Sequence, residues 1–432
     1  MSETVDLLLH PDWLLSMAAD AGAVSGHSLA ISGDHIAAVG PRAELAARFD
    51  ARTQIELPNR LLLPGLINAH THAAMTLLRG VGEDQPLQPW LFEHIWPAEQ
   101  RLVGEDFVAF GTRLAIAEML RSGTTCFADM YFFPEVVARE ATRAGIRAQL
   151  AFPIIEQANP WCADLDEAFR KGLALHDTYR DDRLIRVAFG PHSAYAVSET
   201  ALARVLTYAE ELDLKIQMHV HENAVEVEDA RPLAALDRLG LLNPSLQAVH
   251  MTQLTAQEIE RVAATGVSVV HCPASNMKLA SGACPTRDLL DAGIPVALGT
   301  DGAASSNSLD MLQAARLMAL LAKHETGAAD ALRAREALEA ATLGGARALG
   351  VDDRLGSLEP GKLADAVAID LTHPAMLPLI DPVSQLVHTE AGGKVTEVWV
   401  GGEQVVEQGA LLTIDGAALV EGAALWTERL RA

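Results

Sequence analysis

The stretch Pro64-Gly-Leu-Ile-Asn-Ala-His70-Thr-His72 is an apolar strand that ends in two histidines separated by one residue. Similar short runs recur along the chain and alternate with helical stretches such as Phe107–Arg121, Glu199–Leu212 and Leu309–His324. This alternation is typical of α/β proteins with a parallel sheet covered by helices, and eight strands predict a closed (β/α)8 TIM-like barrel. The predicted strands lie near Leu61–Ile67, Thr124–Met130, Arg147–Ile155, Leu184–Gly190, Lys215–Val220, Leu246–Met251, Val267–His271 and Pro295–Gly299.

The two ends of the chain have a different pattern. His27–Gly40 contains two apolar runs around a Gly-Asp turn, which is typical of a β-hairpin, and short β-rich runs return at Asp365–Asp370 and Lys394–Val406. We therefore predict that residues 1–58 and 360–432 form one small β-sandwich domain. The barrel is expected to span residues 59–359.

Composition excludes several classes of protein. The formal net charge of −24, with no block of Lys or Arg, argues against a nucleic acid polymer as a partner. No apolar run approaches the roughly 18 residues of a membrane span, and the first residues lack the basic region of a signal peptide. The four cysteines show no CxxC spacing. We expect a cytoplasmic protein without a membrane span, and a homo-oligomer.

Polar groups follow six of the predicted strands. The carboxyl ends of barrel strands form the active-site face, so these groups are expected to share one site. They are His70 with His72, His192, His219, His250, His271 and Asp301.

Some of these groups have the spacing of metal ligands. Residues two apart on a strand face the same side, so His70 and His72 are able to reach one ion. His219 and His221 share the same spacing, which does not say which of them binds, and Asp301 follows another apolar strand. Each motif alone has a simpler interpretation: the histidine pairs could lie in surface loops, and Asp301 could be a turn residue. Three histidines and one aspartate suit a divalent ion such as zinc and leave a position open for water.

With these motifs, residues from about Leu61 to Asp370 resemble the amidohydrolase superfamily. The resemblance is to the branch that contains 5-methylthioadenosine/S-adenosylhomocysteine deaminases and the chlorotriazine and ammeline hydrolases. It implies that His70, His72, His219 and Asp301 bind the metal. The fourth strand, Arg186–His192, lacks the lysine that bridges two ions in binuclear members, so one divalent ion per chain is expected, with zinc preferred. The supporting motifs are His72-Ala-Ala-Met-Thr-Leu-Leu-Arg-Gly80, Gly190-Pro-His-Ser193, His271-Cys-Pro-Ala-Ser-Asn-Met-Lys-Leu279 and Gly299-Thr-Asp-Gly-Ala-Ala-Ser-Ser-Asn307.

The same resemblance implies roles for further residues. Glu222 would be the proton shuttle, Asp301 would take a proton from the metal-bound water and contact the substrate, and His250 would orient the hydroxide. Glu99 would hold the ribose hydroxyls, and His192 would make a second substrate contact. The alternatives are an exposed loop carboxylate for Glu222, a buried core histidine for His250 and a helix-start carboxylate for Glu99. His271 is expected to be structural.

The predicted reaction is hydrolytic deamination of an adenine nucleoside, 5′-methylthioadenosine and/or S-adenosylhomocysteine, to the inosine analogue and ammonia by attack at C6. The third strand ends in Ala151-Phe-Pro-Ile-Ile without an arginine for a homocysteine carboxylate, which favours the shorter substrate. The alternatives are an s-triazine aminohydrolase acting on N-ethylammeline-type compounds, a guanine or cytosine deaminase, and an inactive barrel scaffold. The complete ligand set argues against the scaffold.

Overall fold

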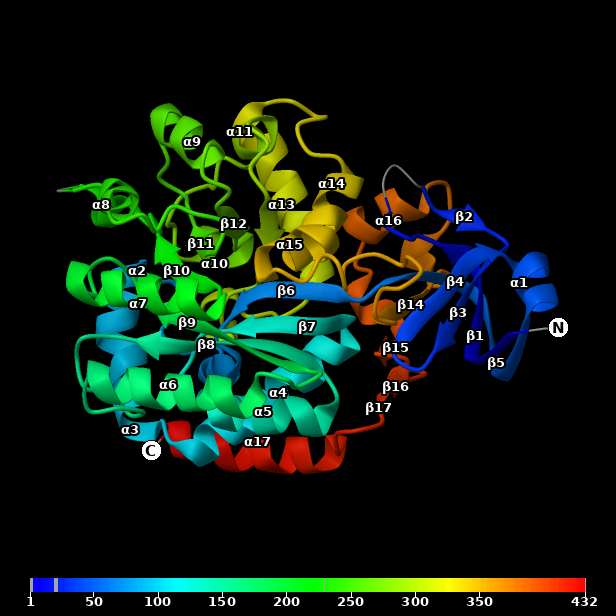
Figure 1. Cartoon of the computed structure of the whole chain (residues 1–432), viewed down its shortest axis with the longest axis horizontal. Coiled ribbons are helices and arrows are strands. Elements are labelled where there is room, and N and C mark those ends of the chain that lie inside the picture. Colours follow the sequence, from blue (N-terminus) through cyan, green and yellow to red (C-terminus); the bar gives the residue numbers. More distant parts are fainter. Residues whose placement is uncertain (1–2, 19–21, 229, 432) are drawn as a thin grey trace.

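The computed structural model describes residues 3–18, 22–228 and 230–431, and its larger part is an eight-stranded parallel barrel. The strands follow one another around the barrel in chain order, which confirms the predicted fold class (Figure 1). They are β6 (Leu66–Thr71), β7 (Thr124–Asp129), β8 (Arg147–Ile154), β9 (Ile185–Pro191), β10 (Ile216–Val220), β11 (Leu246–His250), β12 (Ser268–His271) and β13 (Val296–Leu298).

The seam between β13 and β6 is closed just beyond the end of β13. The Asp301 amide donates to the His70 carbonyl at 3.0 Å, and the Thr300 amide donates to Asn68 Oδ1 at 3.0 Å. These bonds tie the last strand end directly to the first His-x-His motif.

Helices surround the barrel strands. Those of the outer layer are α4 (Glu105–Arg121), α5 (Pro134–Ala144), α6 (Leu165–Tyr179), α7 (Glu199–Leu212), α8 (Pro232–Arg238), α9 (Ala256–Ala263), α11 (Thr286–Asp291), α13 (Met311–Thr326) and α14 (Ala334–Glu339). Shorter ones lie in the connections: α2 (Leu87–Pro89), α3 (Trp96–Leu102), α10 (Pro273–Lys278), α12 (Ala303–Ser306) and α15 (Gly345–Leu349).

The limits of α13 follow from its capping residues. The helix begins at Met311, two residues after the predicted start, because the Asp310 side chain accepts from the amides of Leu312 and Gln313. It ends before Gly327, which has a φ of 68°.

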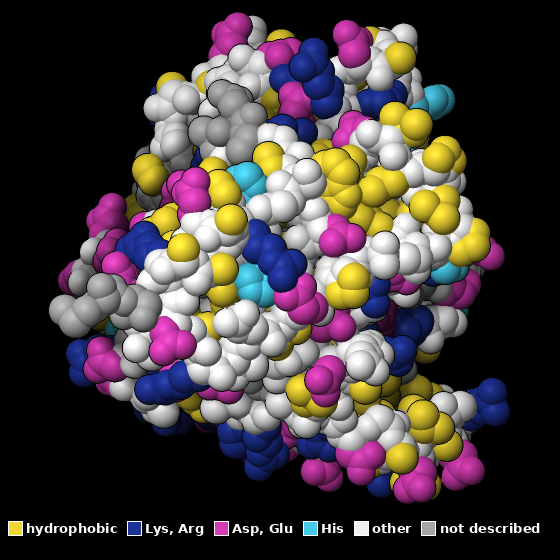
Figure 2. Space-filling model, turned by 90° about the vertical axis from the view of Figure 1, so that its right-hand side faces the viewer, with side chains coloured by type: hydrophobic (Ala, Val, Ile, Leu, Met, Phe, Trp, Pro, Cys, Tyr) yellow, Lys and Arg dark blue, Asp and Glu magenta, His cyan; other side chains and the backbone are white. Residues whose placement is uncertain are grey.

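The chain ends build a small β-domain whose strands belong to one continuous mixed sheet. Its order is β17-β16-β15-β14-β5-β1-β3-β4, with β2 beside β1. The strands are β1 (Glu3–Leu14), β2 (Val24–Ser25), β3 (His27–Ser32), β4 (His35–Pro41), β5 (Phe49–Pro64), β14 (Ala366–Asp370), β15 (Val395–Val400), β16 (Glu403–Glu407) and β17 (Ala410–Leu411). Helices α1 (Arg42–Arg48) and α16 (Pro382–His388) accompany these terminal segments. On the face seen in Figure 2, acidic and basic side chains are interspersed.

The first predicted barrel strand, Leu61–Ile67, is divided between the two sheets. Its first part ends β5 and pairs with β14, whereas β6 begins after Gly65. A Cβ at Gly65 would overlap the Thr125 side chain, at 2.0 Å from Oγ1, so this crossing requires glycine. The expected division of the chain at residues 58 and 360 stays a prediction.

Contacts from both the C-terminal helix and the small β-domain join the terminal segments to the barrel. Helix α17 (Gly416–Arg431) runs along the barrel beside α4, where the rings of Trp426 and Phe107 meet edge to face at 5.5 Å (Figure 1). At the start of β8, the buried Arg147 Nη2 lies 3.0 Å from Asp365 Oδ1. A buried charge without its partner is costly, so this pair fixes the small domain at the end of the barrel opposite the predicted site. Among the described residues, no helix is long and apolar enough to cross a membrane.

Candidate active site

The carboxyl ends of the barrel strands surround a pocket of about 520 Å³. The residues predicted at the strand ends meet at its floor: His72, His192, His219, Glu222, His250 and Asp301 all line it, and His70 lies beneath them. Glu99 lines the same pocket from α3. The structure therefore brings together every residue predicted for the metal, for the substrate and for catalysis.

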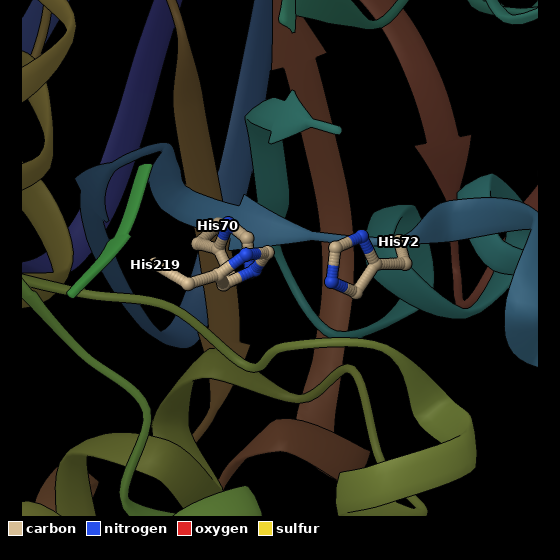
Figure 3. A group of neighbouring side chains, drawn as sticks. All are labelled: His70, His72 and His219. Carbon is tan, nitrogen blue, oxygen red and sulfur yellow. The ribbon is translucent and has the colours of Figure 1, made fainter. Parts of the chain in front are cut away.

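Three imidazoles converge in an arrangement that could hold a metal ion. One ring nitrogen from each of His70, His72 and His219 lies within 4.8 Å of those of the others (Figure 3). Asp301 Oδ1 lies 3.6 Å from His70 Nε2 and 3.4 Å from His72 Nε2. Asp301 thus lies beside two of the three converging imidazoles.

His221 does not join this group. Strand β10 ends at Val220, and His221 has a φ of 51°, so the side chain no longer follows the alternation of a strand. Its Nε2 accepts a hydrogen bond from the Leu233 amide at 3.3 Å. Of the two histidines that the spacing could not distinguish, His219 is the one that lies with His70 and His72.

Hydrogen bonds at the Nδ1 atoms leave the Nε2 atoms of the three imidazoles available to bind a cation. His72 Nδ1 donates to the Met130 carbonyl at 2.5 Å, and His219 Nδ1 donates to the His192 carbonyl at 2.7 Å. Because a carbonyl oxygen only accepts, the Nε2 atoms of these neutral rings carry lone pairs. His70 Nδ1 is bonded to an amide oxygen of Gln217 at 2.8 Å.

The donor set fits a divalent cation. Burial lowers the pKa of His72 to about 4 and that of His219 well below its usual value, so both rings are neutral near pH 7. Nε2 of His70 lies only 3.3 Å from Nε2 of His219, and two facing lone pairs repel unless a positive charge lies near both. Three imidazole nitrogens and one carboxylate oxygen are a donor set of the kind that zinc binds.

Glu222 and His250 face each other beside these ligands. Glu222 Oε1 lies 3.6 Å from His250 Nε2, and Glu222 is only 9% exposed, which is incompatible with a solvated loop carboxylate. Burial, together with the charge of Asp301, raises the pKa of Glu222 well above its usual range. A carboxyl group with a raised pKa is suited to general acid catalysis.

Asn276 holds His250 and was not anticipated from the sequence. Its Nδ2 donates to His250 Nδ1 at 3.1 Å, so the ring proton of His250 lies on Nε2, toward Glu222. Asn276 belongs to α10, which begins two residues after His271. His271, expected to be structural, is fully buried in β12, and neither of its ring nitrogens has a hydrogen-bond partner among the described residues.

Outward from this floor, the pocket has an apolar wall that the sequence did not reveal. A π-helical segment, Trp90–Ile95, continues into α3 and places Trp90, Trp96 and Glu99 along one side. Tyr131 OH donates to Glu99 Oε1 at 2.6 Å. Burial, partly offset by this bond, raises the pKa of Glu99 to about 7.

His192 is partly buried at the pocket floor. Its ring centroid lies 4.8 Å from that of His219, and burial lowers its pKa to about 4. The charged residues that line the pocket are three carboxylates, and none of the described lining residues is a lysine or arginine.

Comparison with known proteins places this site in a family. The Amidohydrolase family matches residues 61–405, and an imidazolonepropionase-like composite domain of bacteria matches residues 29–51. A 5-methylthioadenosine/S-adenosylhomocysteine deaminase of Teredinibacter turnerae is 48% identical over 99% of this chain and 98% of its own length. A 5′-deoxyadenosine deaminase of Methanothermobacter thermautotrophicus is 41% identical, over 93% of this chain and 94% of its own.

A solved structure agrees with these relatives. The crystal structure of an adenosine deaminase from Xanthomonas campestris with bound zinc is 47% identical and covers 100% of both chains, with a TM-score of 0.98. Both the sequence match and the arrangement of the site confirm the resemblance predicted from the strand-end motifs. This chain belongs to the amidohydrolase family.

Proposed function

We propose that this protein is a zinc-dependent hydrolytic deaminase of adenine nucleosides that carry a small apolar group at the 5′ position, with 5′-methylthioadenosine as the preferred substrate. One observation carries the proposal. Three imidazole Nε2 atoms, Asp301 and Glu222 converge at the floor of a nucleoside-sized pocket. The names of the relatives support the same chemistry.

The side chains that would hold one divalent ion per chain are those of His70, His72, His219 and Asp301. When bound, such an ion acts as a Lewis acid that lowers the pKa of a coordinated water from 15.7 toward about 7. The remaining steps belong to the side chains of this chain.

Asp301 accepts a proton from the attacking water, and His250 donates a hydrogen bond from Nε2 that orients it. Glu222 donates its proton to N1 of adenine as oxygen adds to C6, which prevents negative charge from accumulating on the ring. The proton held by Asp301 passes to the amino group, the C6–N6 bond breaks and ammonia leaves, and the remaining hydroxyl proton at C6 returns to Glu222. The product is the inosine analogue.

The outer pocket supports the choice of substrate. Glu99 can accept both hydroxyl hydrogens of a ribose diol, and its Oε1 is already held by Tyr131. The apolar wall with Trp90 and Trp96 suits a thioether methyl group. S-adenosylhomocysteine would bring a carboxylate into a pocket whose described lining offers only carboxylates as charged partners.

An ammonia-release assay across four substrates tests this proposal. We expect kcat/KM to be highest for 5′-methylthioadenosine and 5′-deoxyadenosine and at least about tenfold lower for S-adenosylhomocysteine. A hydrogen bond to a charged group contributes about 1.5–3 kcal/mol, and the homocysteine carboxylate would lack such a bond in this pocket. N-ethylammeline, which has no ribose, should be a poor substrate. Preference for S-adenosylhomocysteine would contradict the proposed specificity, and preference for the triazine would contradict the proposed substrate class.

Glu99→Gln serves as the matched variant in the same assay. It should lower kcat/KM for the nucleosides by about ten- to a hundredfold, since a carboxamide presents a donor where the diol needs an acceptor. The low rate on N-ethylammeline should not change. Equal losses on both classes would show that Glu99 does not contact the ribose.

A further inference from the structure

Three buried glutamines cross the barrel interior below the metal site. They are Gln149 in β8, Gln217 in β10 and Gln247 in β11, each the only amide side chain in its strand and at most 3% exposed. Side chains that fill such barrels are mostly apolar, and burying an amide is costly unless its hydrogen bonds are satisfied. Three buried amides on neighbouring parts of the barrel therefore point to a role beyond filling space.

Hydrogen bonds link the three amides in series. Gln247 Nε2 donates to Gln149 Oε1 at 2.7 Å, and Gln217 Nε2 donates to Gln247 Oε1 at 2.7 Å. At the upper end, Gln217 Oε1 lies 2.8 Å from Nδ1 of His70. The series thus connects the base of the barrel to a metal ligand.

Backbone carbonyls fix the direction of every amide in this series. Each NH2 group also donates to a backbone oxygen: Gln149 to Leu349 at 3.1 Å, Gln247 to Ala348 at 2.9 Å and Gln217 to Ala69 at 3.0 Å. A carbonyl oxygen only accepts, so each NH2 group must face its backbone carbonyl. Each amide oxygen must then face the next side chain in the order Gln149, Gln247, Gln217 and His70. Gln217 consequently presents its oxygen to His70, whose Nδ1 must carry the proton.

We propose that Gln217, oriented by Gln247 and Gln149, is the positioning residue that selects the tautomer of His70 and directs its Nε2 lone pair toward the divalent ion. His72 and His219 obtain the same tautomer directly from backbone carbonyls. His70 instead depends on a side-chain amide, which would offer either an oxygen or an NH2 group if it were free to turn over. The inference rests on the metal site proposed above and is independent of the substrate.

Zinc affinity measured by competition with a chromophoric chelator tests this role. Gln217→Leu should weaken zinc binding by about ten- to a hundredfold, the range typical of residues that orient metal-bound histidines. Gln217→Glu keeps an acceptor for His70 Nδ1–H and should recover most of the affinity. Gln247→Met leaves the contact with His70 intact but removes support for Gln217, so it should cause a smaller loss.

Ser268→Ala is the matched control, because Ser268 is buried on β12 in register with Gln247 but lies outside the series. It should bind zinc like the wild type. Nitrogen-15 NMR of the metal-free full-length chain provides a second readout: His70 should hold its proton on Nδ1 in the wild type and in Gln217→Glu, and exchange between tautomers in Gln217→Leu.

Wild-type zinc affinity in Gln217→Leu, or His70 protonated on Nε2 in the wild type, would overturn the inference. Wild-type affinity in Gln247→Met would overturn the part assigned to the lower glutamines. Because the tautomer is observed without metal or substrate, failure of this inference is distinguishable from failure of the proposed function.

Discussion

Replacement of Glu222 by Gln is expected to leave zinc bound while kcat on 5′-methylthioadenosine falls by about a hundredfold to ten-thousandfold. Glutamine retains the shape of the side chain but cannot relay a proton, and general acid–base groups typically contribute rate factors of this size. The raised pKa of the buried Glu222 supports its role as the group that protonates the ring nitrogen. KM should change less than kcat, because the amide can still donate a hydrogen bond to that nitrogen in the ground state.

Metal content and steady-state kinetics on one preparation check this result. Glu226→Gln is a matched control, since Glu226 lies on the same loop and contacts the Glu222 backbone amide through Oε2 at 2.7 Å without lining the pocket. It should retain most of the turnover rate. A loss below about tenfold in Glu222→Gln with full metal content would exclude Glu222 as the proton donor.

Removal of a metal ligand should abolish activity together with metal binding. His219→Ala deletes one of the three converging imidazoles and leaves a donor set too small for a tight site. His221→Ala is the matched control, because this histidine lies two residues away and its ring bonds the Leu233 amide instead. We expect about one zinc per chain in the wild type and in His221→Ala, and none in His219→Ala.

Elemental analysis after extensive dialysis measures these contents. The same series in His70→Ala and His72→Ala should match His219→Ala. Two equivalents of metal in the wild type, both needed for activity, would contradict a site with one ion. Full activity in any of the three ligand variants would remove that histidine from the site.

The barrel and the floor of the site were predictable because both follow from local sequence patterns. Short apolar runs between amphipathic helices indicate parallel strands, and the carboxyl ends of such strands meet at one face. His70, His72 and Asp301 therefore needed only their positions at strand ends to be placed together. The first barrel strand was predicted to begin at Leu61, several residues before its true start, because the apolar residues that end β5 extend to Pro64.

The remaining features depend on contacts between residues far apart in the sequence. The spacing could not separate His219 from His221, because it does not show that β10 ends at Val220. Asn276 reaches His250 across 26 residues. The glutamine series joins three strands, and in each strand its only sign is one amide within an apolar run. The apolar wall comes from a π-helical connection that has no pattern of its own.

Product analysis in ¹⁸O-labelled water tests the central claim most directly. If the zinc-loaded protein is a hydrolytic deaminase of 5′-methylthioadenosine, each turnover should release one ammonia and yield 5′-methylthioinosine with one ¹⁸O atom at C6, because the oxygen comes from water. Mass spectrometry detects this product as a single labelled species. Unchanged methylthioadenosine, or cleavage to free adenine with no release of ammonia, would contradict the account.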